Sequence, residues 1–178
     1  MNNYILTGTP GAGKTTLLNG LKALQYNVIT ESATDIIAQE QANGTPKPWE
    51  HVAFLAQITT LQMDRQHVAN KSSKNTTFFD RSPICTYALC TFLKYTPPQL
   101  LLNEIKRIRA LKVYNNDVFF IENLGHVAQT SARRINYEDA LLFEQMHKDA
   151  YKKFGFNLIT IEKDSIENRI KKIIGFCR

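Results

Sequence analysis

The sequence has no long hydrophobic run and few cysteines, and these two absences exclude several classes of protein. No apolar stretch approaches the roughly 18 residues that a membrane-spanning helix needs, so we expect no membrane span. The three cysteines, Cys85, Cys90 and Cys177, lack the paired spacing of a zinc site and are too few for a disulfide framework. Thiols that stay reduced are typical of the cytoplasm, and the first apolar segment begins by residue 4 without a leader-like stretch. We therefore expect a cytoplasmic protein.

The chain also lacks a strong charge of one sign and a repeated metal-binding motif. It carries 22 Lys and Arg against 16 Asp and Glu, a formal net charge of +6. The basic residues near the C-terminus alternate with acidic ones and are not interleaved with aromatic side chains. This is typical of a solvated helix face and does not favour nucleic-acid binding. Glu144 and His147 form a Glu-x-x-His pair, but a di-iron site needs a second copy and the sequence has none.

The composition is sufficient for one folded domain over residues 1–178. Hydrophobic residues make up 43% of the chain and charged residues 21%, as in ordinary globular domains. Nearly continuous apolar segments that alternate with helical stretches predict a parallel sheet with helices on both faces, the doubly wound α/β class. The five segments predicted as strands are Tyr4–Thr7, Asn27–Thr30, Thr77–Asp80, Val118–Ile121 and Leu158–Ile161.

The first of these segments runs directly into GTPGAGKT, which matches G-x-x-x-x-G-K-[ST], the phosphate-binding P-loop. Its glycines let the chain curl around a phosphate, and successive backbone N–H groups point inward as an anion nest. We expect Lys14 to reach the β and γ phosphates and the Thr15 hydroxyl to bind Mg²⁺. The N-terminus of the following helix adds a partial positive charge. The residues expected to contact the nucleotide are Gly8, Thr9, Pro10, Gly11, Ala12, Gly13, Lys14, Thr15 and Thr16.

Local signals also predict where several helices begin. Capping-box spacing joins Ser32 to Asp35, Thr96 to Gln99 and Asp164 to Glu167, and Pro83 and Pro97 are expected just inside helix starts. A stiff turn at residues 44–48 precedes a long helix that we expect from Trp49 to about Val68. Residues 123–136 lack periodicity and precede a capped helix, which is a natural place for a mobile lid in a P-loop domain.

Three predicted strands end in acidic residues, and ligands of open α/β sheets bind at the carboxyl ends of the strands. Asp80 follows an apolar strand as a Walker-B aspartate does, which favours Mg²⁺ binding over a helix cap or an ion pair with Arg81. Glu31 is our candidate general base, and the alternative is stabilisation of the helix that starts near Ser32. Glu122 is either near the metal or an ordering contact for the lid.

Phosphoryl transfer also needs positive charge on the transferring group, which arginine can supply. Arg133 and Arg134 lie in the predicted lid, so we expect one of them to contact phosphate, although exposed arginine pairs are common. Arg81 could bind an acceptor or pair with a carboxylate. Arg65, late in the long helix, could reach the acceptor pocket or lie on the surface.

These residues resemble the P-loop kinase group, which comprises nucleotide and nucleoside kinases and small ATPases labelled AAA. The sequence is most similar to a family that includes the bacterial ribosylnicotinamide kinase domain. The shared segments are GTPGAGKTT, VITESATDII, FFDRSP, FFIEN, the arginine pair and DAYKKFGFNLITIEKDSIENRIKKII. The resemblance implies the three-layer P-loop NTPase fold with strand order 2-3-1-4-5. It also implies that Glu31 and Asp80 face the acceptor and that Arg133 and Arg134 lie in the lid. It does not imply an AAA+ machine, because the chain has no room for the helical lid domain.

The leading hypothesis is therefore an ATP-dependent small-molecule kinase that uses Mg²⁺. We expect its acceptor, nucleoside-like or another alcohol, between the ends of the second and third strands and the long helix. No strand is followed by the Asn-Lys-x-Asp of signalling GTPases, since Asn70-Lys71-Ser72-Ser73 lacks the aspartate, and this favours ATP over GTP. Two alternatives remain open: an NTPase that switches a partner by hydrolysing ATP, and a nucleotide-binding interaction module with little turnover.

Overall fold

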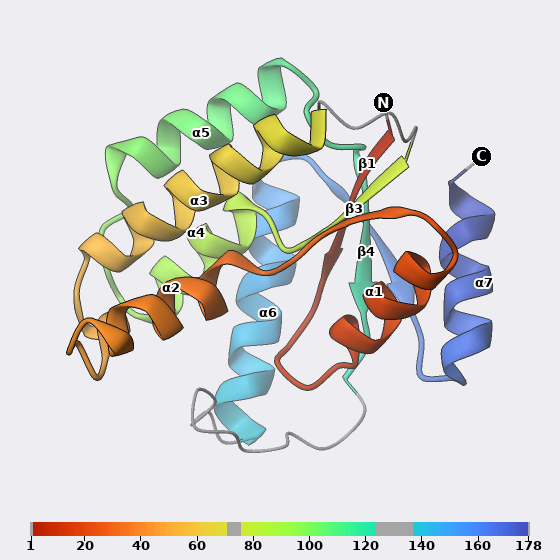
Figure 1. The fold of residues 1–178 in the computed structure, drawn as a ribbon, viewed down its shortest axis with the longest axis horizontal. Coiled ribbons are helices and arrows are strands. Elements are labelled where there is room, and N and C mark those ends of the chain that lie inside the picture. The colour runs from red at the N-terminus through yellow and green to blue at the C-terminus, as the bar shows by residue number, and fades with distance from the viewer. Residues whose placement is uncertain (1, 71–75, 124–136, 178) are drawn as a thin grey trace.

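A five-stranded parallel sheet runs through the middle of the protein (Figure 1). The structure is a computed structural model and describes residues 2–70, 76–123 and 137–177. The described strands lie in the order β2-β3-β1-β4-β5, and every neighbouring pair is parallel. The predicted class and strand order are confirmed, and each predicted strand agrees with the observed one to within two residues at either end. The strands are β1 (Asn2–Thr7), β2 (Asn27–Ile29), β3 (Thr76–Asp80), β4 (Asp117–Ile121) and β5 (Asn157–Ile161).

Helices cover both faces of this sheet. On one face, α1 (Lys14–Ala23) packs against α7 (Ile166–Phe176) (Figure 1). On the other face, α4 (Pro83–Phe92) packs against α6 (Tyr137–Lys153). The same side of the molecule is extended by α2 (Ser32–Ala42), α3 (Ala53–Asn70) and α5 (Gln99–Ala110).

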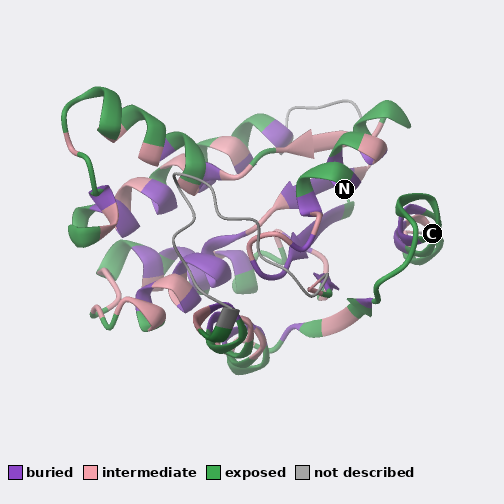
Figure 2. Ribbon diagram, turned by 90° about the horizontal axis from the view of Figure 1, so that it is seen from below, coloured by how far each residue is buried: buried purple, intermediate pink, exposed green. Residues whose placement is uncertain are grey.

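Alternate residues of the strands supply the two main cores, one on each face of the sheet. On β1, Tyr4 and Leu6 join the cluster formed with α1 and α7, whereas Ile5 joins the cluster formed with α4, α5 and α6. Phe78 and Phe79 of β3 divide between the two clusters in the same way. Both faces of the central strands are therefore buried, which explains why their sequences are continuously apolar (Figure 2).

A third and smaller cluster lies away from the sheet, between α2 and α3. Its buried members are Ile36, Phe54 and Ile58, and Trp49 packs against them. Trp49 belongs to a short 3-10 helix, Pro48–Glu50, that precedes α3. The long helix therefore begins at Ala53, four residues after the predicted start, because the chain forms this separate turn first.

Two consecutive prolines explain why the predicted start of α5 was wrong. Thr96 was expected to cap this helix with Pro97 just inside it, but Pro98 is the residue before the first helical residue, Gln99. The helical region is sterically disfavoured for a residue that precedes proline, and Pro97 accordingly lies before the helix. Pro83 does occupy the first turn of α4, as predicted, and Ser82 caps that helix by accepting a hydrogen bond from the backbone N of Ile84.

The caps of α2 and α7 each lie one residue from the predicted position. Glu31, not Ser32, precedes the first residue of α2, and its side chain does not cap the helix. The hydroxyl of Ser165 caps α7 by accepting from the backbone N of Asn168. Asp164 instead accepts hydrogen bonds from the backbone N of Ser165 and from the side-chain amide of Asn168. Within the described ranges, no helix combines the length and the apolar character needed to cross a membrane.

Candidate active site

The P-loop connects the end of β1 to the start of α1 and depends on glycine at its first residue. Gly8 has φ of 134°, and a Cβ atom there would lie 2.4 Å from the carbonyl oxygen of Ile121, at the end of β4. Only glycine avoids both the strained backbone and this collision. Gly11 and Gly13 also have positive φ, and Gly13 immediately precedes the first helical residue, Lys14. The sequence motif therefore adopts the tightly curled loop that it predicts.

Lys14 is buried, and its ammonium group is held by the loop itself. Its Nζ donates hydrogen bonds to the carbonyl oxygens of Gly8 and Thr9, at 3.0 Å and 2.9 Å. Burial, followed by the nearby charge of Arg81, lowers the pKa of Lys14 from 10.5 to about 8. The carboxylates of Asp80 and Glu31 oppose this change. The two carbonyl oxygens carry only partial negative charge, so a phosphate bound in the loop would stabilise the charged form of Lys14 more strongly.

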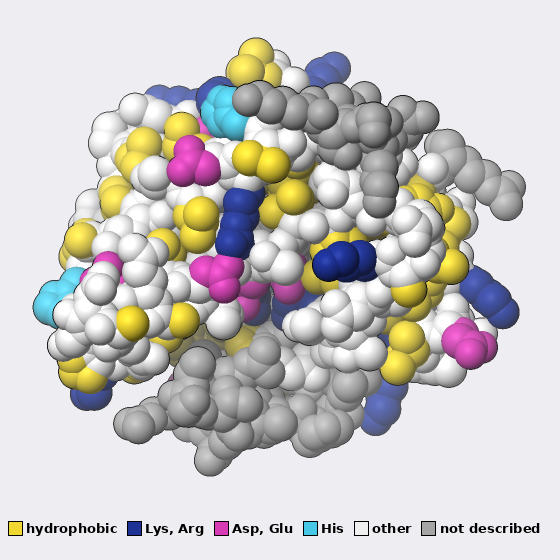
Figure 3. Space-filling model, in the orientation of Figure 1, with side chains coloured by type: hydrophobic (Ala, Val, Ile, Leu, Met, Phe, Trp, Pro, Cys, Tyr) yellow, Lys and Arg dark blue, Asp and Glu magenta, His cyan; other side chains and the backbone are white. Residues whose placement is uncertain are grey.

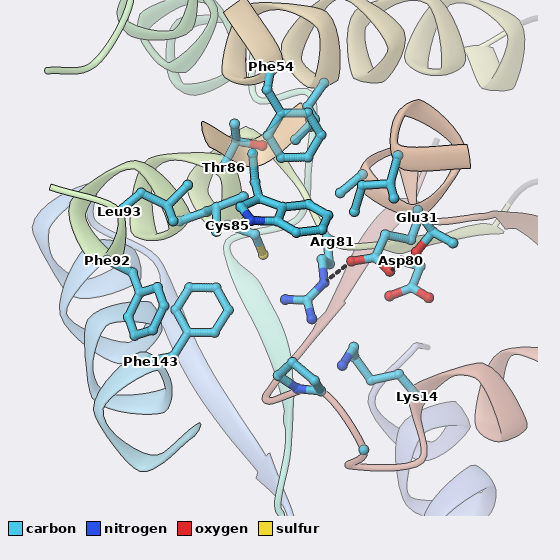
Figure 4. A pocket seen from close by; sticks show the side chains of 18 of the residues that line it. Lys14, Glu31, Phe54, Asp80, Arg81, Cys85, Thr86, Phe92, Leu93 and Phe143 are labelled. Carbon is cyan, nitrogen blue, oxygen red and sulfur yellow. Dashed lines mark hydrogen bonds and ion pairs between the residues drawn. The ribbon is translucent and has the colours of Figure 1, made fainter. Parts of the chain in front are cut away.

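Glu31 and Arg81 form an ion pair beside the P-loop, joining the end of β2 to the end of β3 (Figure 4). Burial alone would raise the pKa of the Glu31 carboxyl, but the charges of Arg81 and Lys14 and a hydrogen bond from Thr34 outweigh it and lower the pKa. The pKa of Arg81 is raised, because its attraction to Glu31 outweighs its burial. Both side chains are therefore charged at neutral pH. The sequence left open whether Arg81 binds an acceptor or pairs with a carboxylate, and in the structure it pairs with the carboxylate of Glu31.

Asp80 lies next to the P-loop strand, as the predicted strand order requires. It is aligned with Leu6 of β1 across the β1–β3 pair. Asp80 and Thr15 both line the same pocket, so a carboxylate and a hydroxyl oxygen are available beside the P-loop. Mg²⁺ in nucleotide sites takes few protein oxygens and completes its shell with phosphates and water, so these donors fit it. No described segment holds three or more His, Cys, Asp or Glu side chains arranged for a tighter metal site.

A pocket of about 660 Å³ extends from the P-loop past the Glu31–Arg81 pair. It lies where the acceptor was expected, between the ends of β2 and β3 and helix α3. Figure 3 shows acidic and basic side chains close together around a hollow near the middle of this face, and Figure 4 shows Phe92 and Phe143 side by side within the pocket. Its far part is lined mainly by apolar and aromatic side chains from five helical segments: Ala33, Ile37, Trp49, Phe54, Ile58, Leu89, Phe92, Leu93 and Phe143.

Two polar side chains stand among these apolar walls. Gln62 of α3 is buried, and its Oε1 accepts a hydrogen bond of 3.1 Å from the hydroxyl of Thr86 on α4. Both residues line the pocket, as does the thiol-bearing Cys85. An apolar cavity with a few fixed polar groups is typical of a small-molecule site.

Two other sequence candidates lie outside the pocket. Glu122 follows β4, is exposed, and its Oε2 accepts a hydrogen bond from the backbone N of Lys163. Arg65 forms an ion pair with Asp35 and donates to the carbonyl oxygen of Thr30 at 2.9 Å. It therefore ties α3 to the start of α2, one residue from Glu31, instead of reaching the acceptor or lying free on the surface. The predicted lid beyond Asn123, with Arg133 and Arg134, lies outside the described residues.

One buried residue of the site was not identified from the sequence. His147 of α6 contacts Arg81 directly, at 3.1 Å between Nε2 and Nη1. The sequence pattern places His147 on the apolar face of its helix, together with Phe143. A fully buried histidine on such a face needs a hydrogen-bond partner, and that requirement is the only sequence signal for this contact.

Comparison with solved structures supports the same architecture. The structure of deoxyadenosine kinase from M. mycoides with the products dCMP and a flexible dCDP matches with a TM-score of 0.66, 16% identity and 98% of each chain covered. The same protein with bound dATP gives a TM-score of 0.64, also at 16% identity and 98% of each chain. With bound dCTP the values are 0.58 and 18%, over 99% of this chain and 98% of that one. At this level of identity the likeness shows a shared fold.

Comparison with sequences identifies the family. No curated protein matches the chain significantly. Residues 3–169 match the sequence model of the family described as the AAA domain. This match spans the P-loop, all five strands and the start of α7, and the chain therefore belongs to the AAA domain family.

Proposed function

We propose that this protein is an ATP-dependent kinase that transfers the γ-phosphoryl group of ATP to a hydroxyl group of a nucleoside-like small molecule. The observation that carries the proposal is the Glu31–Arg81 pair, which stands between the P-loop and a largely apolar pocket. Phosphoryl transfer requires that a phosphate and an acceptor meet at one place with charged groups around them. This arrangement supplies both binding regions and the charged groups at their junction.

On the phosphate side, the loop amides and Lys14 would bind the triphosphate. Lys14 would exchange the carbonyl oxygens of Gly8 and Thr9 for phosphate oxygens, which favour its charged form. Thr15 and Asp80 would hold Mg²⁺, which neutralises charge on the β and γ phosphates when bound. From the sequence alone, we also propose that Arg133 or Arg134 contacts the transferring group.

On the acceptor side, Glu31 would receive a hydrogen bond from the acceptor hydroxyl. Its pKa is below the ordinary value, so it is ionised at neutral pH and able to accept. As a general base it would also take up the proton of that hydroxyl group as the oxygen attacks the phosphoryl group. Arg81 would hold the carboxylate in place and add positive charge near the γ-phosphoryl group that the acceptor oxygen attacks.

The chemistry of the pocket supports an aromatic acceptor without a phosphate of its own. Its far walls are aromatic and aliphatic, with the amide of Gln62 and the hydroxyl of Thr86 among them. Arg81 is paired with Glu31, and Lys47 near the rim is paired with Glu50, at 2.9 Å. The nucleotides bound by the deoxyadenosine kinase of similar fold also support a nucleoside-like acceptor. A switch that only hydrolyses ATP has no need for a pocket that extends from the P-loop into apolar and aromatic walls, so the transferase is favoured.

The test compares Glu31→Gln with Asp35→Asn in an ADP-release assay with ATP and Mg²⁺. The assay is run without acceptor and with each member of a panel of nucleosides and other alcohols. Both substitutions remove a carboxylate that pairs with an arginine near the start of α2, but only Glu31 lines the pocket. Nucleotide affinity is measured in parallel by calorimetry.

We expect at least one nucleoside to raise ADP release well above the rate without acceptor. Glu31→Gln should lower that acceptor-dependent rate by about 10²-fold to 10⁴-fold, with ATP affinity changed by less than about threefold. Asp35→Asn should stay near the unmodified rate. If no acceptor raises ADP release, the transferase proposal is wrong and the hydrolytic switch is favoured. Equal activity of Glu31→Gln and the unmodified protein would rule out the role of Glu31 alone.

A further inference from the structure

A buried histidine holds Arg81 on a second edge, besides the one that faces Glu31. His147 lies on α6, 66 residues further along the chain, and is completely buried. Its Nε2 is 3.1 Å from Nη1 of Arg81. Arg81 thus has one partner from the β2–α2 junction and another from α6. Arg81 itself lines the pocket.

The hydrogen bonds of His147 determine which of its nitrogens carries the proton. Nδ1 lies 2.8 Å from the carbonyl oxygen of Phe143, and a carbonyl oxygen can only accept. Nδ1 must therefore be the donor, which leaves Nε2 of a neutral ring as a lone pair that accepts from Arg81. This tautomer satisfies both ring nitrogens and places no second positive charge against the guanidinium.

The surroundings keep this imidazole neutral over the whole physiological range. Burial, followed by the charge of Arg81, lowers the pKa of His147 to about 3. The charged groups that act on it come from three other elements: Arg81 after β3, Lys14 of α1 and Glu31 before α2. The two cations oppose protonation and outweigh Glu31. His147 is thus a permanent hydrogen-bond acceptor and not a pH sensor.

Arg81 needs such an anchor because its backbone is in an unusual conformation. Its φ is 73°, in the left-handed region, and its backbone N donates to the carbonyl oxygen of Leu6 at 3.0 Å. The residue lies between β3 and α4, so neither strand nor helix geometry directs its long side chain. A planar guanidinium held at two edges by partners on different elements has one orientation. His147 supplies the second edge.

We propose that His147 is a positioning residue, whose neutral Nε2 holds Arg81 so that the guanidinium stays against Glu31 at the junction of the phosphate and acceptor sites. The contact itself is independent of any reaction, and its effect on turnover rests on the proposed kinase function. Phe143 takes part from the same helix, since it lines the pocket and its carbonyl oxygen fixes the ring of His147. The aromatic wall of the acceptor pocket and the charged pair are thereby connected through one turn of α6.

The test uses two substitutions that separate hydrogen bonding from volume. His147→Gln can place an amide oxygen near the position of Nε2, whereas His147→Phe fills the space without an acceptor. Phe156→Leu is the control for lost packing, because Phe156 is buried against Tyr151 of α6 but does not line the pocket. Urea unfolding gives the stability of each variant.

The first readout is NMR of the protein without ligands, which does not depend on catalysis. The ¹⁵N spectrum of unmodified His147 should show the Nδ1–H tautomer with no titration between pH 5 and pH 8. The ¹³C titration of the Glu31 carboxyl should move to higher pH in His147→Phe, because Arg81 is no longer held against it. It should stay near its original position in His147→Gln and in Phe156→Leu. A proton on Nε2, or an unchanged Glu31 titration in a folded His147→Phe protein, would overturn the proposal.

The second readout is acceptor-dependent turnover. A misplaced guanidinium should lower kcat on the order of 10-fold to 100-fold in His147→Phe, with the KM for ATP unchanged. His147→Gln should recover most of that loss, and Phe156→Leu should lose stability without losing turnover. If the NMR result holds and no acceptor is phosphorylated, the kinase function fails and the positioning role stands. If turnover depends on an acceptor but is equal in all three variants, the positioning role fails and the kinase function stands.

Discussion

Replacing Gly8 with alanine tests whether the curled P-loop depends on its close contact with β4. The added Cβ would lie 2.4 Å from the carbonyl oxygen of Ile121, where ordinary contact begins at 3.4 Å. The loop would therefore have to move by about 1 Å to relieve the overlap. An L residue at position 8 would also be strained, because the backbone there has φ of 134°. Gly44→Ala is the matched control, since Gly44 has φ of 90° but no atom within 4 Å of an added Cβ.

Both substitutions place an alanine at positive φ, but only Gly8→Ala also creates a steric overlap. A left-handed alanine is unfavourable by about 1–2 kcal/mol, and the stiffer unfolded chain offsets about 0.4–1 kcal/mol of this. Gly44→Ala should thus lower the free energy of unfolding by about 1 kcal/mol. Gly8→Ala adds a steric overlap with backbone worth about 1–3 kcal/mol, for a total of about 2–4 kcal/mol.

Function should distinguish the two variants more sharply than stability does. The carbonyl oxygen of Gly8 contacts Lys14, so a displaced Gly8 moves the anchor of the lysine that we propose to bind phosphate. A shift of about 1 Å at the reacting groups lowers turnover on the order of 10²-fold. The measurements are urea unfolding, nucleotide calorimetry and ADP release. The reasoning is refuted if Gly8→Ala matches Gly44→Ala within about 0.5 kcal/mol and binds nucleotide normally, since effects of that size are ordinary for surface changes.

Two further predictions concern α1. Gly20→Ala adds a good helix former, but the new Cβ atom would lie 2.3 Å from Cδ1 of Ile170. The substitution Ile170→Val removes that Cδ1 atom. In urea unfolding, Gly20→Ala alone should destabilise the protein by about 1–2 kcal/mol. In the Ile170→Val background the same substitution should stabilise it by about 0.5–1 kcal/mol. If the effects of the two substitutions on the free energy of unfolding simply add, the overlap with Ile170 is not the cause. The pKa of Lys14 is about 8 when folded and 10.5 ordinarily, so the free protein loses this charge as pH rises through 8. Because phosphates favour the charged form of Lys14, nucleotide affinity should fall above pH 8 by roughly tenfold per pH unit. Calorimetry in that range should also show that nucleotide binding takes up a proton. A Kd that stays constant up to about pH 9.5 would exclude this role of the Lys14 charge.

The backbone scaffold could be predicted from the sequence because its signals are local. Apolar runs set the strands, and the P-loop motif sets the glycines that curl the loop. The acidic ends of β2 and β3 followed from strand direction, since parallel strands end at one edge of the sheet. The resemblance to P-loop kinases supplied the strand order, which places Asp80 beside β1.

The side-chain partners could not be predicted because they join elements distant in sequence. Arg81 could have paired with a carboxylate or an acceptor, and the choice depends on where β2 and α6 place Glu31 and His147. The sequence assigned no role to Cys85, yet it lines the pocket, because α4 begins directly after the charged end of β3. The start of α5 was missed for a local reason, the effect of Pro98 on the residue before it.

The separation of the small cluster around Phe54 from the two sheet cores has an evolutionary consequence. The P-loop is anchored to β1 and β4, whereas much of the apolar wall of the pocket rests on α2, α3 and the turn that carries Trp49. Substitutions in that wall reshape the pocket without loosening the strands that hold the loop. Relatives can therefore diverge in the molecule that the pocket binds while they keep the same P-loop. Differences among such proteins should accumulate around Trp49, Phe54 and Ile58.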